Sequence, residues 1–162
     1  MRAAWALAFV AVALTGTAVA QVPHAHGVAR LDVTLEGRRL TLDFAAPLED
    51  VLGFERRPAN DKERAAFEAA AAYFKAGRAL VASAAANCRV AEGNVEIEER
   101  GKGHFEWVAR LAYDCKEPQE AREIDAPLLV RFKQIKRIEV RAVSAKGQSS
   151  ARLTLTKRFF AL

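Results

Sequence analysis

The chain has 162 residues, of which 25 are Lys or Arg, 20 are Asp or Glu and 51% are hydrophobic. This length fits one domain. The composition excludes a disordered chain, which is poor in apolar residues, and a fibrous protein, which is repetitive.

The first twenty residues have the pattern of a secretory signal peptide. Arg2 precedes an apolar run, and Ala18-Val19-Ala20 forms a small-x-small cleavage site. A membrane anchor is the alternative, but such a helix needs about 20 apolar residues, and Thr-Gly-Thr at positions 15–17 interrupts this run. We predict that residues 1–20 are a signal peptide and that residues 21–162 form one exported domain.

Alternating apolar residues predict a β-hairpin at the start of this domain. They run from Ala29 to Leu35 and from Leu40 to Phe44, on either side of a turn at residues 36–38. The residues between them are polar. Only one side of the hairpin can therefore be buried, and another element must cover it.

One long helix is predicted after Pro58. Asn60 is its expected N-cap, and Phe67, Phe74 and Val81 recur at heptad spacing on one apolar face. We expect this face to cover the sheet, and Gly77 is a position where the helix either ends or kinks.

The strongest strand pattern ends at the second of two cysteines. Apolar residues occupy every odd position from Phe105 to Cys115, and Val95 and Ile97 precede them across a Gly-rich turn, which predicts a second hairpin. Cys88 and Cys115 form an even pair without C-x-x-C spacing. In an exported protein we expect one structural disulfide, with two free buried thiols as the alternative.

The last part of the chain predicts a short element and a third hairpin. For residues 128–132, which follow Pro127, we favour a brief helix over a strand. Alternation at residues 138–142 and 151–155 predicts the hairpin. Together the elements predict an α+β fold: a mostly antiparallel sheet of sequential hairpins, covered by one long helix, with a short helix in addition.

Basic residues are concentrated in this last part. Residues 128–162 contain nine Lys or Arg and one acidic residue, a net charge of +8. Export and the lack of a nucleic-acid-binding motif argue against nucleic acid as a partner. We favour one solvated face over a site for an anionic surface or partner. The residues concerned are Arg131, Lys133, Lys136, Arg137, Arg141 and Lys146.

No catalytic motif is present. The sequence has neither a Gly-x-Ser-x-Gly elbow nor a Gly-rich phosphate loop, so we predict that the protein is not an enzyme. Carboxylate pairs such as Glu49-Asp50 fall in predicted turns, and we interpret them as solvated surface.

The histidines are candidate metal ligands. His24 and His26 share a face of an extended segment, about 6–7 Å apart, and a third ligand could come from His104, Glu106 or a surface Asp. The mature chain has no Met and its cysteines are expected to be oxidised. Imidazole and carboxylate remain, and they suit Zn²⁺ best, followed by nickel and Cu(II). From the residues alone, a solvated N-terminal tail is favoured over a metal site.

Three features occur together in this chain. They are His24-Ala25-His26-Gly27 before the first strand, the Gly53-Phe54-Glu55 segment, and His104 at the start of the strand that ends at Cys115. In these features, and in its paired cysteines, the chain resembles the ZrgA-like family of periplasmic proteins linked to zinc uptake.

The resemblance implies a periplasmic zinc-binding accessory that assists a zinc transporter component in the cell envelope. His24, His26 and His104 match histidines of the family and would be the zinc ligands. Family members commonly carry a His- and Asp-rich loop between the cysteines, whereas residues 91–103 contain no His here.

Two hypotheses follow from this comparison. In the first, a single modest site delivers zinc to a transporter component. In the second, the protein is a metal-independent interaction module that uses the Gly53-Phe54-Glu55 turn and the basic C-terminal hairpin as contact surfaces.

Overall fold

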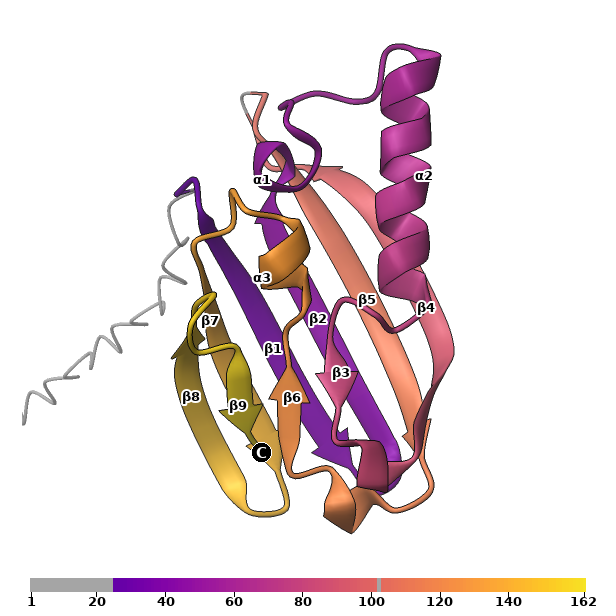
Figure 1. Ribbon diagram of the computed structural model, residues 1–162, viewed down its shortest axis with the longest axis vertical. Helices are drawn as coiled ribbons and strands as arrows, with labels where there is room; N and C mark the ends of the chain where they lie inside the picture. Colours follow the sequence, from indigo (N-terminus) through magenta and orange to yellow (C-terminus); the bar gives the residue numbers. More distant parts are fainter. Residues whose placement is uncertain (1–24, 102) are drawn as a thin grey trace, which may run out of the picture.

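Two β-sheets and several short helices form the structure, a computed structural model that describes residues 25–101 and 103–162 (Figure 1). The strands are β1 (Val28–Glu36), β2 (Arg39–Pro47), β3 (Val81–Ala82), β4 (Cys88–Glu99), β5 (Phe105–Cys115), β6 (Glu123–Asp125), β7 (Arg137–Ser144), β8 (Gly147–Leu153) and β9 (Phe159–Ala161). The helices are α1 (Leu48–Leu52), α2 (Asp61–Lys75) and α3 (Leu128–Arg131), with 3₁₀ turns at Ala84–Ala86 and Pro118–Glu120.

The large sheet has the strand order β4-β5-β2-β1-β7-β8. Its three hairpins, β1–β2, β4–β5 and β7–β8, confirm the local predictions. The C-terminal hairpin joins the sheet through a parallel pairing of β7 with β1, and β2 pairs antiparallel with β5. The strands β3, β6 and β9 form a separate small antiparallel sheet.

The predicted α+β fold, with one long helix covering an antiparallel sheet, is wrong. The structure is mostly β, and the large sheet is mixed because β1 and β7 run in parallel. Helix α2 lies along the β4 and β5 side, with its Phe74 reaching Phe44 on β2, while α3 and the small sheet lie over the remainder (Figure 1). The cover is therefore assembled from several short elements.

Helix α2 begins as predicted and ends just before Gly77, one of the two outcomes that the sequence left open there. The Asn60 side chain accepts a hydrogen bond from the Glu63 backbone N–H at 2.9 Å, which confirms the N-cap. The helix ends at Lys75, where the Arg78 N–H donates to the carbonyl of Tyr73. Val81 consequently lies on β3, where it is 40% exposed, and not on the helix face.

The core is centred on aromatic rings between α2 and the large sheet. The Phe74 ring centroid lies 5.3 Å from those of Phe44 and Trp107 and 5.9 Å from that of Phe132. Phe74 and Trp107 are fully buried. This packing confirms Phe74 as the core residue of the predicted helix face, and α3 confirms the predicted short helix.

The other face of the large sheet carries ion pairs. Arg141 donates two hydrogen bonds to Asp32, at 2.6 and 2.7 Å. Glu106, a candidate metal ligand in the sequence, is only 2% exposed, because Arg30 and Arg100 cover it at 2.9 and 3.0 Å. It is therefore not available as the metal ligand suggested by the sequence.

The predicted disulfide is present. Cys88 and Cys115 lie directly opposite each other on β4 and β5 and are bonded. In the part of the chain that the structure describes, no helix combines the length and apolarity needed to cross a membrane.

Tyr113 should make folding sensitive to alkaline pH. Its hydroxyl donates to the Leu80 carbonyl at 3.0 Å, and burial raises its pKa from 10.0 to about 12. Because the unfolded chain ionises first, the stabilisation is complete below pH 10 and is lost as the pH rises through about 12. Urea unfolding should show up to about 2–3 kcal/mol of this loss in the wild type. In Tyr113→Phe the free energy of unfolding should depend less on pH in this range. An equal pH dependence in the variant and the wild type would contradict the prediction.

Candidate metal site

The ends of three strands meet at one end of the large sheet. The pairing of β1 with β2 brings the start of β1 beside the end of β2, and Pro47 on β2 lies opposite Glu106 on β5. The segment before β1, helix α1 after β2, and the turn before β5 therefore converge, at the top of Figure 1. These three segments supply the candidate ligands.

Gly27 fixes the position of His26. The Gly27 N–H donates to the Asp50 carboxylate at 2.6 Å, and its carbonyl accepts from the N–H groups of Lys136 and Arg137. Its φ of +79° suits glycine, and a Cβ there would lie 3.0 Å from the Lys136 side chain. His26 is thus held in place through the hydrogen bonds of its neighbour Gly27.

Helix α1 and the turn after it supply two carboxylates. Glu49 and Asp50 lie in the first turn of α1, and Gly53 ends the helix in the left-handed conformation, with φ +82°. The chain then turns back and brings Glu55 toward Glu49. Asp50 is buried, so the interpretation of Glu49-Asp50 as solvated surface is wrong for Asp50.

Two imidazoles and two carboxylates lie close together here. His26 Nδ1 is 3.7 Å from Glu49 Oε2, and His104 Nδ1 is 3.1 Å from Glu55 Oε1. Ligand atoms of His26, Glu49 and Glu55 all lie within 4.8 Å of one another. Tetrahedral zinc needs about 3.3 Å between ligand atoms, so small side-chain rotations would close this set around one ion.

The structure brings together two of the three predicted histidines. His26 belongs to the cluster with Glu49 and Glu55, and His104 contacts the Glu55 carboxylate of that cluster. His24 lies outside the described residues. The sequence analysis did not identify Glu49 or Glu55 as ligands, although the β1–β2 hairpin itself implies that α1 lies beside His26.

The donor set and its exposure would suit an exchangeable ion. Imidazole and carboxylate ligands suit zinc. The His26 and His104 side chains are 60% and 53% exposed, whereas the Glu55 side chain is 25% exposed. An ion bound here could therefore enter and leave from solvent.

Asp50 should act as a positioning residue for the site. Burial raises its pKa, while the Gly27 N–H and nearby His26 oppose that shift. Asp50→Ala should lower zinc affinity about tenfold or more and cost about 1–3 kcal/mol of stability, because Gly27 loses its acceptor. Asp50→Asn keeps an acceptor oxygen and is the matched control. Competition with a zinc-binding dye measures both, and equal affinity in Asp50→Ala and wild type would contradict this role.

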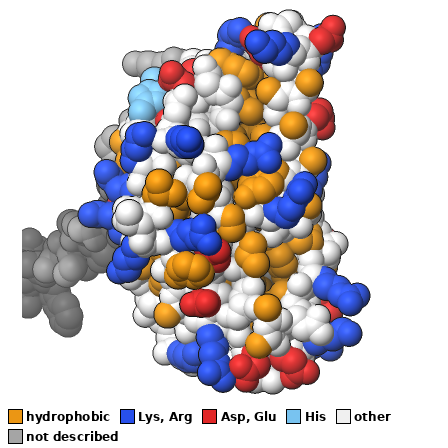
Figure 2. Space-filling view, in the orientation of Figure 1, with side chains coloured by type: hydrophobic (Ala, Val, Ile, Leu, Met, Phe, Trp, Pro, Cys, Tyr) orange, Lys and Arg blue, Asp and Glu red, His pale blue; other side chains and the backbone are white. Residues whose placement is uncertain are grey.

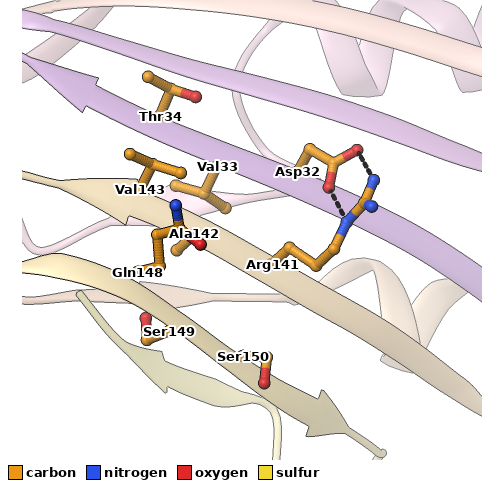
Figure 3. Close-up of a pocket in the computed structure, with 9 residues that line it drawn as sticks. All are labelled: Asp32, Val33, Thr34, Arg141, Ala142, Val143, Gln148, Ser149 and Ser150. Carbon is orange, nitrogen blue, oxygen red and sulfur yellow. Dashed lines mark hydrogen bonds and ion pairs between the residues drawn. The ribbon is translucent and has the colours of Figure 1, made fainter. Parts of the chain in front are cut away.

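A separate hollow lies elsewhere, on the ion-paired face of the sheet. It has a volume of about 540 Å³ and is formed by β1, β7 and β8 (Figure 3). The Asp32 carboxylate in it is already paired with Arg141, and its remaining polar side chains are hydroxyls and the Gln148 amide. This hollow therefore offers a weaker donor set for a metal than the histidine cluster.

Comparison with known proteins agrees with the resemblance seen in the sequence. The family described as "ZrgA family zinc uptake protein" matches residues 23–162. No match was found among curated proteins.

Proposed function

The chain belongs to the ZrgA family of zinc uptake proteins, and we propose that it is an exported zinc-binding accessory that acts in the periplasm. Residues 1–20 would be its signal peptide, and the disulfide suits an oxidising compartment. The proposed role is non-enzymatic: the protein binds zinc and releases it to a zinc transporter component.

The convergence of His26, Glu49, Glu55 and His104 carries this proposal. Elements distant in the sequence place these four side chains at one end of the sheet, and their residue types suit Zn²⁺. Ligand atoms of His26, Glu49 and Glu55 lie within 4.8 Å of one another, and His104 reaches this group through its 3.1 Å contact with Glu55. His24 is a further candidate ligand because it belongs to the same motif. Zinc is the cargo in this proposal, which agrees with the exposure of the imidazoles.

The short 91–103 segment suggests a single site of low capacity. It contains no histidine, so the chain cannot collect several ions there through imidazole ligands. We infer that the protein transfers ions one at a time and does not store them.

A zinc titration of tag-free mature protein tests the proposal. Protein stripped with a chelator should bind one Zn²⁺ per chain with sub-micromolar affinity, measured calorimetrically against a competing chelator. Mg²⁺ should not compete, because it prefers octahedral oxygen coordination and keeps its water ligands. Failure to take zinc from a weak chelator would contradict the proposal and favour the metal-independent interaction module.

A further inference from the structure

The small sheet presents an exposed row of side chains beside the ends of α2 and α3. Val81, Asp125 and Phe159 lie directly opposite one another on β3, β6 and β9, so they share one face. Val81 is 40% and Phe159 50% exposed, whereas Ile124 and Phe160 on the other face are buried. We call this region the Tyr73 surface. It consists of Tyr73, Arg78, Val81, Arg131, Arg158 and Phe159.

Arginines are stacked on the aromatic rings of this surface. The Arg131 guanidinium lies 4.5 Å and that of Arg78 5.6 Å from the Tyr73 ring centroid. Arg158 lies 5.3 Å from the Phe159 ring centroid and pairs with Asp125 at 2.9 Å. Within the described residues, Arg78 and Arg131 have no carboxylate partner in an ion pair.

The basic C-terminal residues are therefore not one solvated face. Arg131 belongs to the Tyr73 surface, whereas Arg141 lies on the opposite face of the large sheet, paired with Asp32. In Figure 2 apolar side chains gather in the middle of the molecule with Lys and Arg among them, and a histidine side chain is visible on the same face.

We propose that the Tyr73 surface binds a carboxylate-rich segment of a partner protein. Arginine with exposed aromatic residues is the composition typical of protein interface centres. Stacking holds the guanidinium groups in place, and each offers a planar fork to a carboxylate. Val81 and Phe159 can receive apolar side chains between the carboxylates. The Tyr73 surface is separate from the histidine cluster, and binding of the segment requires no metal.

The charge of the surface argues against two other occupants. A second copy in a twofold interface centred here would place the same positively charged surface against it. Binding to a membrane would bring the Asp125 carboxylate, which lies between Val81 and Phe159, against the lipid. Only two exposed apolar side chains of this row could insert into the membrane. An acidic protein segment fits both the charge and the apolar row.

The test uses a fluorescently labelled peptide of repeated Glu-Glu-Leu triplets and the full mature chain. Fluorescence anisotropy should show saturable binding that Arg78→Gln/Arg131→Gln weakens about tenfold or more. The matched control is Arg57→Gln/Arg89→Gln, which removes two other exposed arginines outside the surface and should change affinity less than about twofold. Phe159→Ser should weaken binding about threefold through the apolar contact.

Three results would overturn the proposal. Equal loss in both double variants would show general charge attraction without a defined surface. Absence of peptide binding by the wild type would remove the acidic segment as occupant. Arginine-dependent binding to phosphatidylglycerol vesicles without peptide binding would assign the surface to a membrane instead. Thermal melts confirm that each variant is folded before binding is measured.

Discussion

Replacing both His26 and His104 with alanine should abolish tight zinc binding and leave the fold intact. We expect affinity to fall about a hundredfold or more, because these side chains supply the nitrogen ligands, and loss of even an outer-shell partner typically costs 10–100-fold. Both imidazoles are exposed, so the free energy of unfolding should change by no more than about 0.5 kcal/mol.

Variants of Glu49 and Glu55 distinguish a role as metal ligands from a general effect of negative charge. Glu49→Gln/Glu55→Gln keeps the side-chain shapes and removes two negative charges, and it should weaken zinc binding about tenfold or more. Glu36→Gln/Glu68→Gln makes the same charge change at exposed sites outside the cluster and is the matched control. If both double variants lose affinity equally, the carboxylates act only through long-range charge.

His24→Ala, measured alone, decides whether the first histidine of the H-x-H-G motif contributes. A ligand role predicts a loss of about tenfold or more in the single variant. Unchanged affinity would limit the site to the four residues that the structure brings together.

Local patterns predicted the hairpins because alternation is a property of neighbouring residues. The odd-numbered apolar residues of the run from Phe105 to Cys115 pack into the core, and the run forms β5 as expected. The parallel pairing of β7 with β1 could not be predicted this way, since alternation does not specify which strands meet. The strands β3, β6 and β9 have only two or three residues each, which is too short to show a period.

The candidate site, too, could be predicted only in part from the sequence. Residue type identified His26 and His104, because imidazole is rare in this chain and chemically distinctive. Glu49 and Glu55 are two of many acidic residues, and only the tertiary fold distinguishes them. The antiparallel pairing of β2 with β5 brings His104 to the end of β2, and the turn at Gly53 directs Glu55 to meet it.

Removing the disulfide should lower the stability of the fold and leave zinc affinity nearly unchanged. Removing the histidines should do the reverse. In the chain-entropy model, Cys88→Ala/Cys115→Ala should cost about 3–4 kcal/mol of stability for a sequence separation of 27, which corresponds to a melting temperature lower by about 10 °C. Cys115 ends β5 and His104 precedes its start, roughly 35 Å away along an extended strand. Zinc affinity, measured where the variant is folded, should therefore stay within about threefold of wild type.

These two double variants together test whether fold and site are independent. Intact protein should show no reactive thiol before reduction, and calorimetric melts with and without zinc should separate the two effects. An unchanged melting temperature in Cys88→Ala/Cys115→Ala would contradict a stabilising bridge. A loss of zinc affinity in the same variant would show that the site depends on the far end of the sheet. The ligands come from segments before β1, after β2 and before β5, and only a rigid sheet keeps those segments in register.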